Sequence, residues 1–248
     1  MSTGPKRIGI RYPRRRLVRG LLRTLTRALF HLLTRLEVLG RENLPAEGPL
    51  LVAINHFNFA DPALILRVVP RQLEVLGGFH TPNGPTWGPL ILKLYGNLPV
   101  KRGTGARDAL RAAEGILAQG GVVGIAPEGG SWATVLRPPR PGAAFLAARS
   151  GARVVPVGID GTPDIFPSLR RGQRARVTVR IGQPLGPFQA AGHGQERRCQ
   201  LDAIGEQIMR RIAELIPPEH RGYYSDDPAV LAAAKGTEAY PWDDAQEF

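Results

Sequence analysis

Cysteine and long apolar runs are both scarce in this chain of 248 residues. Cys199 is the only cysteine, so no disulfide can form within the chain. No run of about 18 consecutive apolar residues occurs, which argues against a membrane-spanning helix. The N-terminal residues also lack a compact apolar stretch with a small-residue cleavage site, so we expect no secretory signal. Together these absences favour a reducing compartment, the cytoplasm.

The sequence contains none of the common signatures of metal, nucleotide or serine-hydrolase sites. Its five histidines are scattered without paired ligand spacing, so we expect no metal site. Neither Gly-x-Ser-x-Gly nor a Walker-type loop is present. A pI near 10.9 keeps a nucleic-acid binder as an alternative from another class. No helix-turn-helix or RNA-recognition signature supports that alternative, and we expect no nucleic-acid partner.

Charge is distributed unevenly along the chain. Residues 1–36 hold ten Lys or Arg and no Asp or Glu, which gives +10 of the formal net charge of +12. From Gly222 onward the sequence has six acidic residues against Lys235, or −5. We therefore expect a basic segment over residues 1–37, a central domain over 38–216 and an acidic tail over 217–248.

The basic segment has the pattern of an amphipathic helix. Its apolar residues fall within an arc of about 120° on a helical wheel, with arginines beside or opposite them. The apolar set is Val18, Leu21, Leu22, Leu25, Leu29, Leu32, Leu33 and Leu36, and the basic set is Arg16, Arg19, Arg23 and Arg27. Such a helix can lie on an anionic membrane, with leucines inward and arginines at the lipid phosphates. The alternative is that the leucine stripe packs on the protein.

Between the two charged ends, predicted strands and helices alternate. Apolar or alternating runs predict strands over residues 50–54, 73–76, 98–100, 122–126, 154–159 and 176–181. Helical patterns cover residues 62–69, 89–94, 106–119, 143–150 and 196–216. This alternation predicts a single α/β domain, with a largely parallel or mixed central sheet flanked by helices and preceded by the amphipathic segment.

A histidine and an aspartate follow the first of these strands. His56 precedes Asp61 by five residues, so the two would not share a face of one helix and a turn must bring them together. Asp61-Pro62 predicts a helix N-cap followed by proline at the first helical position. An aspartate there can fix the tautomer of a histidine on the preceding loop and stabilise its imidazolium form. The plain alternative is a helix cap next to a hydrogen-bonded loop histidine.

Four blocks of sequence resemble the glycerolipid acyltransferases, the family that acylates glycerol 3-phosphate and lysophosphatidic acid. In family order, the blocks are His56-x-x-x-x-Asp61, Gly96 to Arg102, Pro127-Glu128-Gly129 and Val154-Val155-Pro156. The resemblance implies that His56 abstracts a proton from a glycerol hydroxyl, which then attacks an acyl thioester, while Asp61 orients His56. It implies acyl-CoA or acyl carrier protein as co-substrate, with no other cofactor. The alternative is a non-catalytic relative that only binds lipid, and the presence of both His56 and Asp61 argues against it.

The same resemblance assigns residues to the acceptor. Arg102, with Lys101 beside it, is the candidate for the acceptor phosphate, because guanidinium offers a planar fork that matches phosphate oxygens. Glu128 and Gly129 would help to hold the acceptor. The plain alternatives are that Glu128 and Gly129 form an ordinary loop and that Lys101 and Arg102 form a solvated turn. His56, Arg102 and Glu128 each follow a predicted strand, so we expect them at the carboxyl edge of the sheet, in one site.

The third block departs from the family after Pro-Glu-Gly. The family usually continues with threonine, arginine and serine, whereas this chain has Gly130-Ser131-Trp132. Arg137 or Arg140 is a candidate to replace the missing arginine at the acceptor phosphate. The favoured acceptor is lysophosphatidic acid, as in phospholipid biosynthesis, and the alternative is another lysolipid or an amphipathic alcohol without phosphate. We expect a peripheral enzyme at the cytoplasmic face of the cell membrane.

An apolar patch precedes the second block. It consists of Trp87, Pro89, Leu90, Ile91, Leu92, Leu94 and Tyr95. Two interpretations stay open, a groove for the acyl chain beside the membrane and ordinary hydrophobic core.

Overall fold

The computed structural model describes residues 10–77, 86, 88–100 and 105–239. Their centre is a seven-stranded sheet in the order β1-β7-β6-β2-β5-β3-β4. The strands are β1 (Thr34–Leu39), β2 (Leu50–Ile54), β3 (Leu73–Gly77), β4 (Leu98–Pro99), β5 (Val122–Ile125), β6 (Arg153–Asp160) and β7 (Ala175–Ile181). All neighbours pair in parallel except β6 and β7, which are antiparallel. The predicted α/β domain with a mixed sheet is confirmed.

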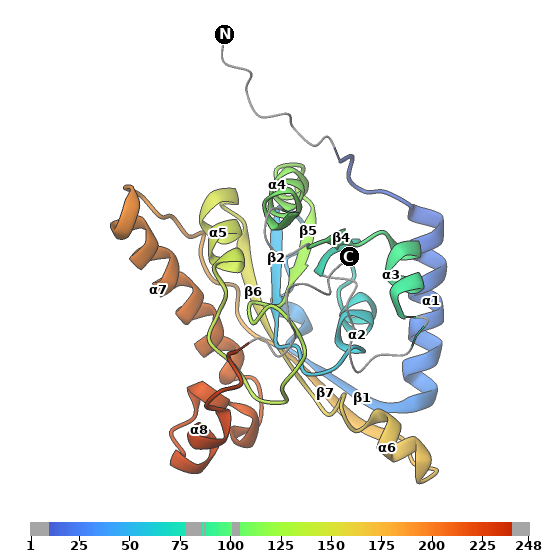
Figure 1. Ribbon diagram of the computed structural model, residues 1–248. Coiled ribbons are helices and arrows are strands. Elements are labelled where there is room, and N and C mark those ends of the chain that lie inside the picture. Colours follow the sequence, from blue (N-terminus) through green and yellow to red (C-terminus); the bar gives the residue numbers. More distant parts are fainter. Residues whose placement is uncertain (1–9, 78–85, 87, 101–104, 240–248) are drawn as a thin grey trace.

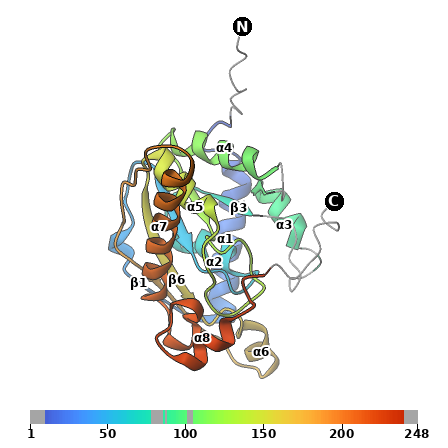
Figure 2. The same ribbon diagram turned by 60° about the vertical axis from the view of Figure 1, so that its left-hand side comes forward.

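Helices cover both faces of the sheet (Figure 1). One layer contains α4 (Gly105–Leu117), α5 (Pro141–Ser150) and α7 (Gly194–Ala213), and the other contains α1 (Arg16–Leu33), α2 (Asp61–Val68) and α6 (Ile165–Arg170). Figure 2 shows α5 and α7 in front of the sheet, with α1 and α2 behind it. The remaining helical elements are α3 (Gly88–Tyr95), α8 (Pro228–Ala234) and the 3-10 turns Arg41–Asn43, Pro218–His220 and Gly222–Tyr224.

The central strand β2 is buried along its whole length. Leu51 and Ala53 pack into the core under α4, α5 and α7, whereas Leu50, Val52 and Ile54 pack into the core under α1 and α2. A parallel strand covered on both faces needs apolar side chains at every position, which explains its continuous apolar sequence. The polar residues that follow β2 are therefore the first that can reach a ligand.

Every predicted strand and helix of the central domain is present to within a few residues, but β1 was missed. The helical wheel placed Leu36 on the amphipathic helix, and this placement is wrong because α1 ends at Leu33. Residues 34–39 alternate in burial and pair in register with β7. In the sequence, the leucine repeat of α1 continues into these residues and hides their period-two pattern. Pairing with β7 makes them a strand. Helices α6 and α8 were also missed.

Helix α1 turns its leucine stripe away from the protein. Leu17 is 90% exposed, Leu21 63% and Leu32 70%, and Val18, Leu25 and Leu29 are exposed as well. The alternative in which the stripe packs on the protein is wrong for these residues. Phe30, on the opposite face of the helix, is buried instead.

Two of the helix arginines also differ from expectation. Arg19 is buried and forms an ion pair with Glu74, and Arg23 donates hydrogen bonds to the carbonyl oxygens of Val69 and Pro70. The expectation of a contact with lipid phosphate is wrong for Arg19, whose buried guanidinium is paired with Glu74. A buried carboxylate and the free carbonyls at the end of α2 both require donors, and the arginine face of α1 supplies them.

The apolar patch before Gly96 lies mainly on α3, beside α1. Leu90, Ile91 and Leu94 are exposed, so ordinary core is wrong for these three side chains. Trp87 lies outside the described residues. None of the helices that the structure describes is long and apolar enough to cross a bilayer.

Candidate active site

His56 leaves the carboxyl end of β2 at a tightly held position. The residue before it, Asn55, is fully buried, and its side chain bonds to the neighbouring strand β6. Asn55 Nδ2 donates to the Ile159 carbonyl oxygen at 2.8 Å, and Asn55 Oδ1 accepts from Ile159 N–H at 2.7 Å. These bonds continue the strand pairing by one side chain, so the direction in which His56 leaves the sheet is fixed.

Asp61 orients the His56 imidazole. His56 Nδ1 lies 3.1 Å from Asp61 Oδ2, and the Asp61 side chain is completely buried. Phe57 N–H and Asn58 N–H donate to the same oxygen at 2.8 and 2.7 Å, and the Thr162 hydroxyl donates to Oδ1 at 2.6 Å. A carboxylate with only donors around it accepts a hydrogen bond from Nδ1–H, which leaves Nε2 without a proton and free to act as the base. The imidazole keeps 18% of its side-chain surface exposed.

The detail of the predicted N-cap at Asp61 is wrong by one position. Helix α2 begins at Asp61 itself, with Ala60 as the N-cap and Pro62 in the first turn. The carboxylate faces back to the loop N–H groups of Phe57 and Asn58 instead of capping the first helical turn. It still lies at the N-terminal end of α2.

Glu128 holds the backbone of His56. It follows β5, the neighbour of β2, and is buried. Its Oε1 accepts His56 N–H at 3.1 Å, and its Oε2 accepts Arg137 N–H and Nε–H, both at 3.2 Å. Burial raises the pKa of Glu128 to about 7, while Arg137 and the two backbone N–H groups oppose the shift. Gly129 provides the turn after Glu128 with a φ of +85°, which side-chain-bearing residues rarely adopt.

Arg137 is part of the protein interior. Its side chain is 1% exposed, and its guanidinium lies 3.8 Å from the centre of the Trp132 ring. Because Glu128 and the Gly130 carbonyl accept from it, it does not replace the missing arginine at an exposed phosphate. Arg140 is exposed and lies against Gly129, where an added Cβ would be 3.2 Å from Arg140 Cγ.

The C-terminal segment supports this loop from outside. Leu136 N–H donates to the His220 carbonyl at 2.9 Å, and Tyr223 N–H donates to the Leu136 carbonyl at 3.1 Å. The His220 ring also lies 5.9 Å from that of Phe57, the residue after His56. The segment expected as an acidic tail therefore packs against both loops of the site.

The structure brings together four of the predicted site residues. His56, Asp61, Glu128 and Gly129 lie at the carboxyl ends of β2 and β5, with Arg140 beside them. Their common location is as predicted, and their individual roles in the reaction stay predictions. Within the described residues, no three His, Cys, Asp or Glu side chains gather where they would hold a metal ion.

Two predicted site residues are not described by the structure, and other residues of the site have no clear signal in the sequence. Lys101 and Arg102 lie outside the described residues. Sequence reasoning missed Asn55, Thr162 and the positioning contacts of Arg137. Thr162 follows β6, which also pairs with β2. The rule that ligands bind at the carboxyl ends of strands could therefore have indicated Thr162.

Comparisons with known proteins identify the family. The family model described as Acyltransferase matches residues 35–160. The 1-acyl-sn-glycerol-3-phosphate acyltransferase of Bacillus subtilis (strain 168) is 25% identical over 180 residues, 72% of this chain and 87% of that protein. A 1-acyl-sn-glycerol-3-phosphate acyltransferase of Chlamydomonas reinhardtii is 26% identical over 192 residues, 75% of this chain and 54% of that protein.

A solved structure shares the fold. The 1-acyl-sn-glycerophosphate (LPA) acyltransferase PlsC from Thermotoga maritima aligns with a TM-score of 0.54 at 22% identity, covering 78% of this chain and 79% of that one. The family match extends over half of this chain and includes both strand ends from which His56 and Glu128 emerge. This protein therefore belongs to the glycerolipid acyltransferase family and is an acyltransferase.

Proposed function

We propose that this acyltransferase transfers a fatty acyl group from a thioester to the free hydroxyl of lysophosphatidic acid, giving phosphatidic acid. The observation that carries the proposal is the His56 imidazole, which a fully buried carboxylate holds in one tautomer at the edge of the sheet. The names of the Bacillus subtilis and Chlamydomonas reinhardtii relatives support the choice of acceptor.

In the proposed reaction, His56 Nε2 takes the proton of the acceptor hydroxyl while the hydroxyl oxygen attacks the thioester carbonyl carbon. The new C–O bond forms, the C–S bond breaks, and the imidazolium returns the proton to the leaving thiolate. Asp61 stabilises the imidazolium through Nδ1. A positioned base contributes about 10²–10⁴ in rate, so substrate positioning and oxyanion stabilisation supply the rest. Acyl-CoA or acyl carrier protein is the co-substrate, and no other cofactor is needed.

Glu128 acts on this reaction through His56. Both of its oxygens are occupied by donors of the protein, and the side chain is buried. We therefore assign it a positioning role for the His56 backbone. Arg140 is the described candidate for the acceptor phosphate, since it is exposed beside Gly129. Lys101 and Arg102 remain candidates from the sequence.

The enzyme docks on an anionic membrane through α1 in this proposal, at the cytoplasmic face where the thioester donors occur. Six apolar side chains of α1 and three of the neighbouring α3 are exposed. Burying each leucine contributes about 1.5–3 kcal/mol, so a few of them suffice for peripheral binding.

A pair of variants tests the docking surface. Leu21→Asp with Leu25→Asp should abolish binding to vesicles that contain anionic lipid, because two charges would enter the apolar layer. Leu39→Asp is the control, since Leu39 is also exposed but lies on β1. Equal vesicle binding by the α1 variant and the control in a flotation assay would contradict docking through α1.

The acceptor is tested by product analysis. Purified protein and vesicles are incubated with lysophosphatidic acid, lysophosphatidylcholine or a long-chain alcohol, each with acyl-CoA or acyl carrier protein donors. Mass spectrometry should identify phosphatidic acid as the main product. Preferential acylation of the alcohol would replace the proposed acceptor with the phosphate-free alternative.

A further inference from the structure

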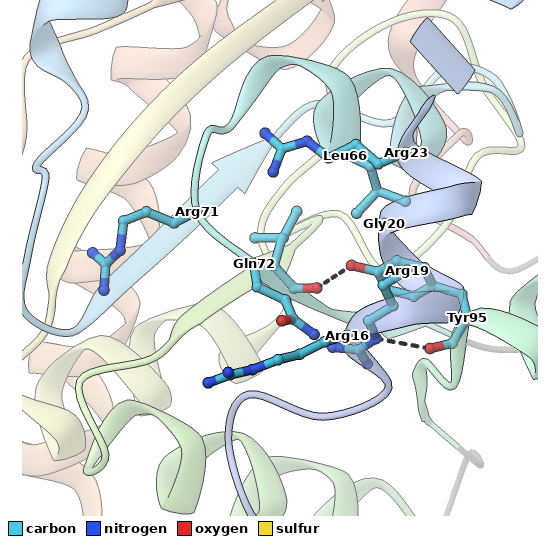
Figure 3. A pocket seen from close by; sticks show the side chains of 9 residues that line it. Arg16, Arg19, Gly20, Arg23, Leu66, Arg71, Gln72 and Tyr95 are labelled. Carbon is cyan, nitrogen blue, oxygen red and sulfur yellow. Dashed lines mark hydrogen bonds between the residues drawn. The ribbon is translucent and has the colours of Figure 1, made fainter. Parts of the chain in front are cut away.

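A second polar site lies far from His56, near the amino end of β3 and not at the carboxyl ends of the strands. It is a pocket of about 210 Å³ between α1, the end of α2 and the start of β3. Its polar lining consists of Arg16, Arg19, Arg23, Arg71, Gln72 and Tyr95 (Figure 3). β3 begins beside the pocket and runs in the same direction as β5 and β2, whose carboxyl ends carry Glu128 and His56. About one strand length, roughly 16 Å, therefore separates the two sites.

Positive charge is in excess around this pocket. Four arginines line it, and no carboxylate does. Glu74 behind the pocket is buried and already paired with Arg14 and Arg19. Arg16, Arg23 and Arg71 form no ion pair with any residue that the structure describes, and Figure 3 shows these three around Gln72.

Two of the guanidinium groups also retain free donors. Arg23 Nε and Arg71 Nη1 are buried and have no hydrogen-bond acceptor among the described residues. Their other donors bind only backbone carbonyl oxygens, those of Val69 and Pro70 for Arg23 and that of Gly120 for Arg71. Burial lowers the pKa of Arg23, and Arg27 nearby lowers it further. Unpaired buried donors are costly, and an anion bound in the pocket would supply acceptors.

We infer that the pocket formed by Arg16, Arg23, Arg71 and Gln72 binds a phosphate group. Guanidinium groups match phosphate oxygens in charge and in planar geometry. The pocket volume of about 210 Å³ is smaller than that of pockets for drug-sized ligands, which is roughly 300–1,000 Å³. The pocket therefore suits one small group. The phosphate comes from a lipid headgroup beside the exposed leucines of α1 or from a free anion. This inference does not depend on acyl transfer by His56.

Phosphate binding is tested on the full-length protein with inorganic phosphate as the probe. Calorimetry at constant ionic strength should give one saturable site. Arg16→Gln with Arg71→Gln should weaken it by about tenfold or more, because two guanidinium partners are lost. The matched control is Arg35→Gln with Arg198→Gln, which removes the same charge at exposed positions outside the pocket and should leave binding unchanged.

A second variant blocks the pocket without removing charge. Gly20 lines the pocket on α1, and a Cβ added there meets no atom within 4 Å. Gly20→Leu should fold normally, since leucine favours helix more than glycine does, and should also lose phosphate binding. This variant keeps the test valid if the double arginine variant does not fold.

Vesicles distinguish the two sources of phosphate. Phosphatidylcholine vesicles with phosphatidic acid are compared with vesicles of equal charge that contain oleate. If the native protein prefers phosphatidic acid vesicles and Gly20→Leu removes this preference, the ligand is a lipid headgroup. If Gly20→Leu loses only the binding of inorganic phosphate, the ligand is a free anion. The proposal is overturned if the native protein shows no saturable binding of phosphate in either arm. It is equally overturned if the pocket and control variants weaken binding by the same factor.

Discussion

Asp61→Asn separates the charge of the His56 partner from its shape. With the amide oxygen at the Oδ2 position, asparagine still accepts from His56 Nδ1–H, Phe57 N–H and Asn58 N–H. Its NH₂ group then faces the Thr162 hydroxyl, which can turn and accept. The reverse orientation of the amide would place its NH₂ group against three other donors. The orientation with the amide oxygen at the Oδ2 position is therefore preferred. We therefore expect the variant to fold with the imidazole in the same tautomer.

The expected losses follow from these four hydrogen bonds. A hydrogen bond to a charged group is worth about 1 kcal/mol more than a neutral one, and the lower desolvation cost of a buried amide offsets part of that difference. The free energy of unfolding should therefore fall by about 1–3 kcal/mol. Turnover should fall by about 10²–10⁴, because the imidazolium formed in the reaction loses its negative partner.

The assay is thioester cleavage with saturating lysophosphatidic acid in vesicles, alongside urea unfolding. Thr162→Val is the control, since it deletes one bond to Asp61 but leaves the carboxylate charged. It should cost about 1 kcal/mol of stability and less than about tenfold in rate. A folded Asp61→Asn protein with turnover within about tenfold of the native value would refute the reasoning.

Two further predictions concern stability. Because the pKa of Glu128 is raised to about 7 in the fold, its contribution to stability is fully present below its unfolded pKa and is lost as pH rises through 7. Urea unfolding should therefore show the native advantage over Glu128→Gln shrinking by roughly 3 kcal/mol between pH 5 and 8, and a constant difference would contradict this. Gly222→Ala places a Cβ 2.2 Å from the Leu136 carbonyl oxygen, so the unfolding free energy should drop by about 1–3 kcal/mol or more. Gly236→Ala, with positive φ but open space, should cost less in thermal unfolding, and equal losses would exclude the steric contact as the cause.

Local relations in the chain were predictable from sequence. His56 and Asp61 are only five residues apart, and a strand followed by a helix leaves few ways to arrange them. The carboxyl-end rule also predicts Glu128 near His56, because both residues follow strands that pair in parallel.

Relations that depend on distant partners were not predictable. The leucine repeat of α1 defines an apolar face, but it does not say whether protein or solvent meets that face. Arg19 pairs with Glu74, and Arg23 donates to a carbonyl at the end of α2. These contacts place the arginine face of α1 against the protein and the leucine face outward. Thr162 reaches Asp61 from 101 residues away, which no local pattern records.

The central claim is that His56 removes the proton of the acceptor hydroxyl. The most direct measurement is the rate of acyl transfer to lysophosphatidic acid by His56→Ala, with native unfolding and vesicle binding verified on the same sample. We predict a loss of about 10²–10⁴ in turnover. Product formation by the folded variant within about tenfold of the native rate would contradict the claim.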